Sequence, residues 1–283
     1  AHGKNFIIDP GFHNYKGNFE WHKYFRETKA HNCLLIDSLS QAVHGKGLME
    51  WSQVAEPRDI KFITDRDYVF FRASHDGYDH LPGSPRHYRN VLFVNNEFWI
   101  LIDQVSGTGD HLIESYLHFS PVEVEKDSYL WSFKKDDVQL KAFFWGALMN
   151  DEVLEGGKDI QEGWISPLYR NPIPAPLIRF HERVKLPFIR YSAFIPELGE
   201  AVKIDKQDEN HYQIKLANNS YSISTNEVKE KDNSEGFILR VEWLKQGNIK
   251  RLDFVESEST YRLSVQTLTK EGEILTSKEE KIG

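Results

Sequence analysis

The sequence predicts an all-β protein, a large antiparallel β-sandwich of several sheets, of the double-sandwich or super-sandwich kind. Short apolar runs bounded by turn residues recur along the whole chain of 283 residues, and this spacing is typical of sandwich strands. Apolar and polar residues alternate in "LIESYLHF" (112–119) and "VQLKAFFW" (138–145), as they do in strands with one face on a core. No helical period extends beyond about two turns.

The predicted strands follow one another at short intervals. Asn95–Asn96 separates two apolar runs, and "LANNSYSIS" (216–224) repeats this arrangement. Both sites predict hairpins, because Asn tolerates the positive φ of a tight turn. The predicted strands are 5–9, 33–37, 60–64, 68–74, 90–94, 98–107, 111–119, 129–133 and 138–146 in the first half, then 188–195, 212–218, 220–225, 237–243, 251–256, 261–268 and 273–277.

A proline-rich segment, "WISPLYRNPIPAPLIRF" (164–180), interrupts this series. Because Pro lacks the N–H that a sheet ladder needs, the segment is predicted to be a crossing loop or a sheet edge. It divides the chain into a first β-sandwich portion, 1–180, and a second β-sheet portion, 181–283, expected to pack on the first.

Composition narrows the classes of function. The formal net charge of -8 gives no global basic field, so we expect no nucleic-acid partner. Cys33 is the one cysteine, which excludes an intrachain disulfide and a cysteine-based zinc cluster. No apolar run approaches the roughly 18 residues of a membrane helix, and no P-loop, G-x-G-x-x-G or G-x-S-x-G motif is present.

Two residues near the N-terminus suggest a metal site. Asp9 ends an apolar run just before Pro10–Gly11, and His31 lies at the start of the next run. Taken singly, Asp9 reads as a turn cap and His31 as a hydrogen-bonded neighbour. Together they place a carboxylate and an imidazole at the ends of adjacent strands, a pair that suits zinc once further ligands join from elsewhere.

Other histidines have simpler interpretations. His75, His80 and His87 lie in a Gly- and Pro-containing polar segment, which we interpret as a solvated connection. His118 alternates with Tyr116 in a predicted strand and is interpreted as a packed side chain.

The segment "WHKYFRETKAHN" (21–32) combines aromatic and basic side chains. Arg26 offers a bidentate fork for a carboxylate or sulfate, and the aromatic rings offer stacking faces for pyranose rings. The alternative is a basic loop that pairs with Glu20 and Glu27. Composition alone favours neither.

Several motifs in this sequence resemble the β-sandwich part of the heparinase II/III-like polysaccharide lyases. "GKNFIIDPGFHNY" followed by "YFRETKAHNCLLID" resembles the family's D-x-G strand and R-x-T-x-A-H-N loop. "FWILIDQVSGTGDHLIESYLHFSP" resembles its D-x-x-x-G-x-G-x-H strand pair, and "GWISPLYRNPIPAPLIRF" its G-W-x-S-x-x-Y segment. The resemblance extends over residues 3 to 180.

The resemblance implies a larger enzyme than this chain. Members join an N-terminal α/α toroid to the sandwich and cleave uronate-containing polysaccharides, such as heparan sulfate or alginate, by β-elimination. The catalytic base and acid come largely from the toroid, so no catalytic residue is carried over onto this chain, and the fragment alone is expected to be inactive. The expected partners are the toroid and an acidic polysaccharide.

The resemblance also implies roles for individual residues. In some members a zinc ion is held by a His of an H-x-H motif, the Asp of D-x-G and a later His. Asp9 and His31 match the last two ligands, and the first would lie upstream of Ala1. Arg26, Tyr15 and Tyr24 would face the toroid cleft and, with Asn32, are the predicted substrate-binding residues.

Two points stay open at this stage. The same sandwich could serve as a non-catalytic carbohydrate-binding module or an exopolysaccharide-assembly module. A periplasmic or secreted bacterial location is expected, with its targeting signal outside this chain, and a cytoplasmic location is the alternative.

Overall fold

The computed structural model describes residues 1–14, 19–47, 49–147, 150–157, 162–199, 201–229, 235–257 and 261–281. The chain divides into two compact units, Ala1–Leu198 and Gly199–Gly283. Almost all regular elements are antiparallel strands, which confirms the predicted all-β class. None of the helices in these ranges is long and apolar enough to cross a membrane.

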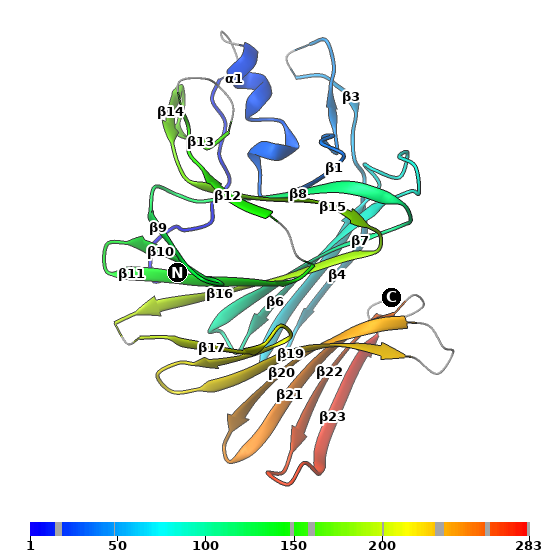
Figure 1. The fold of residues 1–283 in the computed structure, drawn as a ribbon, viewed down its shortest axis with the longest axis vertical. Coiled ribbons are helices and arrows are strands. Elements are labelled where there is room, and N and C mark those ends of the chain that lie inside the picture. The colour runs from blue at the N-terminus through cyan, green and yellow to red at the C-terminus, as the bar shows by residue number, and fades with distance from the viewer. Residues whose placement is uncertain are drawn as a thin grey trace. The chain divides into compact units, whose positions relative to one another are not determined.

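The first unit is a sandwich of a four-stranded and an eight-stranded sheet, which lie one above the other in Figure 1. The four-stranded sheet has the order β1 (Leu34–Ile36), β8 (Asp110–His118), β15 (Leu177–Lys185), β12 (Asn150–Leu154). The eight-stranded sheet has the order β4 (Pro57–Thr64), β5 (Tyr68–His75), β6 (Arg86–Val94), β7 (Phe98–Ser106), β16 (Phe188–Leu198), β11 (Val138–Gly146), β10 (Leu130–Lys135), β9 (Glu123–Asp127).

The core of the first unit lies between these two sheets. Alternating side chains of β10, β11 and β16 meet Leu117 and Ile178 from the smaller sheet. At its centre the rings of Phe119 and Phe133 stack with centroids 3.9 Å apart, and both side chains are fully buried. Such area burial is the main stabilising term for a sandwich of this size.

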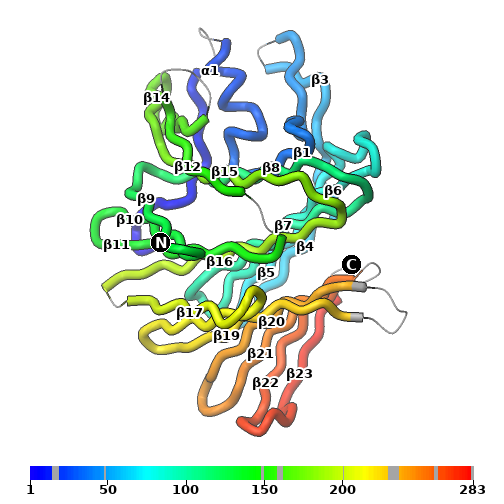
Figure 2. Tube along the Cα trace, viewed as in Figure 1, coloured from blue at the N-terminus to red at the C-terminus, as the bar shows by residue number. Residues whose placement is uncertain are grey.

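A third layer lies on the outer face of the four-stranded sheet (Figure 1). It contains α1 (Phe19–Tyr24), the 3-10 turn η1 (Thr28–Ala30) and the hairpins β2 (Val43–His44) with β3 (Trp51–Gln53) and β13 (Trp164–Leu168) with β14 (Asn171–Pro174). Trp21 and Trp164 meet edge to face at 5.1 Å beside the buried Tyr24 and Phe25. The blue trace in Figure 2 rises from the N-terminus to α1 in this layer.

The hairpin predictions are confirmed. Asn95 and Asn96 have φ of 49° and 58° and join β6 to β7. The second Asn-marked turn joins β18 (His211–Lys215) to β19 (Ser220–Lys229).

Two local predictions differ from the structure. Residues 5–9 form no regular strand, and only an isolated bridge joins Ile7 to Phe119. The proline-rich segment forms a hairpin and then β15, which pairs on both sides with β8 and β12. Pro lies only in the two-stranded hairpin and just before β15, so the nine residues of β15 keep a complete set of ladder donors.

The second unit is one seven-stranded antiparallel sheet whose strands follow in chain order. Buried side chains such as Tyr221, Leu239 and Leu252 alternate with polar ones, as predicted for strands with one buried face. The predicted boundary at 180 falls inside β15, and β16 lies between β7 and β11, so the first unit extends to Leu198. The remaining strands are β17 (Lys203–Asp208), β20 (Glu235–Lys245), β21 (Asn248–Ser257), β22 (Tyr261–Leu268) and β23 (Ile274–Lys281).

Candidate metal centre

Asp9 and His31, the two residues that the sequence predicts as metal ligands, lie in hydrogen-bond contact. His31 Nδ1 is 2.6 Å from Asp9 Oδ1, and the Gly11 N–H donates to Asp9 Oδ2 at 3.0 Å. The hydrogen bond from His31 is the main cause that lowers the pKa of Asp9, and burial opposes it. The carboxylate is therefore charged near neutral pH and able to bind a cation.

Backbone pairing brings the two residues together although 22 positions separate them. The segment that carries Asp9 runs along the end of β8, where the Ile8 N–H donates to the His118 carbonyl at 3.0 Å. The Asn32 side chain joins the Asp9 segment to β8. Its Nδ2 donates to the Ile8 carbonyl at 2.9 Å, and its Oδ1 accepts from the His118 N–H at 2.7 Å. His31 therefore sits on a backbone that is fixed to the Asp9 segment.

His118 fixes the turn before His31. Its Nε2 donates to the Lys29 carbonyl at 2.9 Å, which sets the neutral tautomer with the proton on Nε2. Burial lowers the pKa of His118 to about 4, so the ring is neutral at pH 7. The ring is almost fully buried, in agreement with the sequence interpretation of a packed side chain.

The chemistry of the pair fits part of a zinc site. A carboxylate oxygen and an imidazole nitrogen are zinc ligands, and both side chains keep solvent-exposed surface. Within the described ranges no three His, Cys, Asp or Glu side chains form a group that could hold a metal ion. A third ligand would have to come from outside those ranges.

Arg26 lies on the third layer with its guanidinium held from two sides. Nη1 donates to His22 Nε2 at 3.1 Å, and the guanidinium carbon lies 4.1 Å from the centre of a Trp51 ring. His22 Nδ1 donates in turn to the Asn14 carbonyl at 2.9 Å, which leaves Nε2 as the acceptor. The sequence interpretation did not include His22 or Trp51, although the four-residue spacing of His22 and Arg26 favours contact on one helical face.

The basic-loop interpretation also applies to part of this segment. Lys23 and Lys29 lie 3.5 and 3.6 Å from the two carboxylate oxygens of Glu27. These exposed pairs contribute little stability. The two lysines therefore pair within the loop, whereas Arg26 contacts His22 and Trp51.

The other predicted substrate-binding residues have different positions. Tyr24 is 3% exposed; the Trp164 N–H donates to its hydroxyl at 3.3 Å, and burial raises the pKa of Tyr24 to about 12. The Asn32 amide is used by two backbone groups. We therefore assign structural roles to Tyr24 and Asn32 in place of substrate contact, and Tyr15 lies outside the described residues.

A buried polar network lies behind the Asp9–His31 pair, between the two sheets. Asp103 on β7 accepts from Arg89 Nε at 2.7 Å, from Arg89 Nη2 at 3.0 Å and from His87 Nε2 at 2.8 Å. Burial would raise the pKa of Asp103, but Arg89 and His87 outweigh it and hold the pKa well below its usual range. His75 and His87 belong to strands, so the predicted solvated connection applies to the exposed His80 alone.

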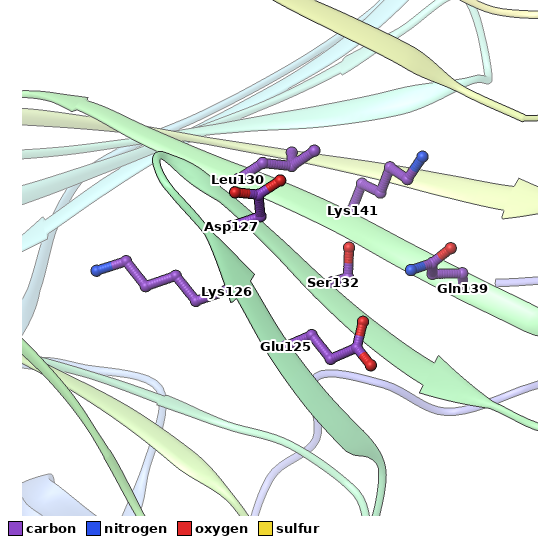
Figure 3. Close-up of a pocket in the computed structure, with 7 residues that line it drawn as sticks. All are labelled: Glu125, Lys126, Asp127, Leu130, Ser132, Gln139 and Lys141. Atoms are coloured by element: carbon purple, nitrogen blue, oxygen red, sulfur yellow. The ribbon is translucent and has the colours of Figure 1, made fainter.

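A surface hollow of about 590 Å³ lies over strands β9, β10 and β11 at one edge of the eight-stranded sheet (Figure 3). Its lining combines both signs of charge on β9, β10 and β11, and it contains none of the candidate residues. The lining residues are Glu125, Lys126, Asp127, Leu130, Ser132, Gln139 and Lys141.

The family model described as "Heparinase II/III-like, C-terminal" matches residues 1–229. The chain belongs to this heparinase II/III-like family. The match includes every motif on which the sequence resemblance rests, and the resemblance is confirmed. No curated protein matched the sequence.

Solved structures with a similar fold include heparinases. A mutant of the heparan sulfate lyase HepC from Pedobacter heparinus is 17% identical with a TM-score of 0.58, over 90% of this chain and 35% of that one. A heparinase III gene product is 16% identical with a TM-score of 0.59, over 99% of this chain and 35% of that one. A further heparinase III structure has a TM-score of 0.55 at 16% identity, over 78% and 33% of the two chains. This heparinase-like chain therefore spans about a third of the length of these proteins.

Proposed function

We propose that this chain is the C-terminal β-sandwich of a polysaccharide lyase that cleaves a uronic-acid-containing polysaccharide by β-elimination. The observation that carries the proposal is the Asp9–His31 contact of 2.6 Å in a chain of the heparinase II/III-like family. Heparan sulfate, alginate or a similar polymer fits this chemistry. The net charge of -8 favours an unsulfated uronate, because sulfates require several local cations.

The reaction needs three functions. A base removes the C5 proton of the uronate, an acid assists departure of the 4-O group, and a cationic or hydrogen-bonding group stabilises the charge that develops on the carboxylate. Arg26 is our candidate for a carboxylate contact, since a guanidinium held by His22 and Trp51 is oriented before substrate arrives. The base and acid come from an N-terminal α/α toroid of the longer protein.

Asp9 and His31 would hold a zinc ion together with a ligand from upstream. When bound, the zinc would order the loop that carries them, a structural contribution more than a Lewis-acid one. The chain's own residues orient that loop beside the third layer. We place the protein in the periplasm or outside a bacterial cell, where such polymers are degraded.

An assay on two proteins tests the proposal. The 283-residue chain and a longer protein with an upstream helical domain are each incubated with alginate and with heparan sulfate. Unsaturated uronate ends are followed by their ultraviolet absorbance. We expect product from the longer protein only. Equal rates from the two proteins, or no product from the longer one on any uronate polymer, would contradict the proposal.

A non-catalytic carbohydrate-binding module is the second candidate. It is favoured by exposed aromatic side chains on the third layer, among them Phe19 at 49% and Tyr169 at 58% exposure, because such rings stack on sugars. Binding of the polymer by the longer protein without any unsaturated product identifies this second function. An exopolysaccharide-assembly protein would give the same result in vitro.

A further inference from the structure

The loop that carries His31 is connected to the opposite sheet through the interior of the sandwich. Arg89 on β6 donates through Nη1 to the carbonyl of Asn32, the residue after His31. The rest of the Arg89 guanidinium is held by Asp103 on the neighbouring strand, with contacts of 2.7 and 3.0 Å. A chain of hydrogen bonds therefore runs from β7 of the eight-stranded sheet to the backbone of the candidate metal loop.

Register and burial make this connection stiff. Arg89 and Asp103 are direct partners across the β6–β7 pair, so their side chains leave the same face of the sheet. Asp103 is 2% exposed and also accepts from His87. A guanidinium that forms bidentate, charge-assisted bonds to a buried carboxylate has few alternative positions.

Asn32 connects Arg89 to the segment that carries Asp9. Its carbonyl is fixed by Arg89, while its amide joins the Ile8 carbonyl to the His118 N–H. Ile8 precedes Asp9 in the chain and His31 precedes Asn32. One residue therefore fixes the backbone beside both members of the Asp9–His31 pair.

We propose that Arg89, oriented by Asp103 and acting through Asn32, is a positioning residue that holds the Asp9 and His31 segments side by side, with the two side chains in contact, before a metal ion binds. The inference rests on the proposed function for the identity of the pair as metal ligands. The network itself contacts no metal ligand side chain. It acts on the backbone, as supporting hydrogen bonds do around other metal sites.

The test compares arginine and asparagine residues that differ in their link to this loop. Arg89→Lys keeps the charge but cannot form the bidentate bonds and the carbonyl bond together. The control is Arg72→Lys: Arg72 is buried whereas Arg89 is half-buried, and Arg72 lies on the adjacent strand β5 and donates to Asn90 Oδ1 at 2.8 Å. Asn32→Ala has its own control in Asn90→Ala, since Asn90 is fully buried.

The first readout needs no metal. Amide hydrogen exchange of the full chain is measured at His31 and Cys33, whose N–H groups bond to the Thr28 and His31 carbonyls, with amides of β11 as the reference for global unfolding. We expect exchange at these two positions to rise roughly tenfold in Arg89→Lys and Asn32→Ala relative to β11. The two controls should leave this ratio unchanged. Equal ratios in Arg89→Lys and Arg72→Lys would overturn the proposal.

The second readout is zinc affinity of the longer protein, measured by chelator competition. Arg89→Lys and Asn32→Ala should weaken zinc binding by about 10–100-fold, the usual effect of removing support around a metal site. Wild-type affinity in both variants would overturn the positioning role. Absence of zinc in the wild type would instead refute the proposed metal function, and the exchange result would still decide whether Arg89 positions the loop.

Discussion

The neighbouring residues His31 and Asn32 have different roles at the same site. His31 directs its ring to Asp9, whereas Asn32 uses its whole amide on backbone groups. The sequence motif that contains both residues predicts a shared functional region, but it does not predict that one side chain contacts Asp9 and the other binds the backbone. The direction of each side chain depends on β8 and on the Asp9 segment, which are distant in the sequence.

Residue types suggested that Asp9 and His31 act together, because carboxylate and imidazole groups are common metal ligands; the two side chains are in contact, and metal binding stays a prediction. Residue types could not distinguish Arg26 from Tyr24. Both lie in one aromatic and basic segment, yet the Tyr24 side chain is buried and the Arg26 guanidinium lies over the Trp51 ring. That difference comes from β3 and β13, whose positions no local pattern encodes.

His75 should make stability depend on pH. Burial lowers its pKa from 6.5 to about 4, and its Nδ1 accepts from the Gly77 N–H at 3.3 Å, a role open only to the neutral ring. Between pH 6.5 and 4 the unfolded chain binds this proton and the folded chain does not. His75 therefore contributes stability above pH 6.5 that is lost as the pH falls toward 4.

Urea unfolding of wild type and His75→Gln at pH 7 and pH 4.5 measures this contribution. Carboxylate protonation affects both proteins alike. Wild type should lose up to about 2–3 kcal/mol more than the variant between the two pH values. The same loss in both proteins would show that His75 is not neutral and buried as described.

At the scale of elements, the hairpins follow from the sequence and the segment around Asp9 does not. Asn95–Asn96 fixes its turn by local backbone preference. By contrast, residues 5–9 have a strand-like composition, yet they make only an isolated bridge at Ile7. Gly11 then forms a backbone bridge with Ser166 of β13. This long-range contact is not specified by the D-P-G motif.

Gly11 is the residue that permits this contact. Its φ is +80°, and an added Cβ would lie 2.6 Å from the Ser166 carbonyl oxygen. Gly3 is a matched control, because its φ is +73° and an added Cβ meets nothing within 4 Å. Gly11→Ala should cost about 1–3 kcal/mol more free energy of unfolding than Gly3→Ala. Urea denaturation measures both, and equal costs would contradict the close packing of β13 on the Asp9 turn.

For the whole chain, the sequence predicts the all-β class and most strands but not how the strands are grouped. Strand β16 lies beyond the proline-rich segment and yet sits between β7 and β11. Most of its residues are buried, and an apolar run of this kind is common to many core strands. Sheet membership is decided by long-range pairing, which a single sequence does not display.

The inter-sheet core makes a clear prediction for the stability of the first unit. Phe133 is fully buried against Phe119, so Phe133→Ala should cost about 3–5 kcal/mol. Phe62, in the same sheet, is 63% exposed, and Phe62→Ala should change stability by no more than about 0.5 kcal/mol. Chemical denaturation followed by near-ultraviolet circular dichroism tests the pair. A similar cost for the two substitutions would refute the assignment of the core.

Asp9 and His31 are proposed to form part of a zinc site that is held by the sandwich and completed by an upstream ligand. This proposal is tested most directly by metal analysis of the longer protein and its Asp9→Ala and His31→Ala variants, with His80→Ala as a control at an exposed histidine. We predict one zinc per protein in the wild type and in His80→Ala, and loss of zinc in the other two. Zinc retained at the wild-type level in both Asp9→Ala and His31→Ala would contradict the account.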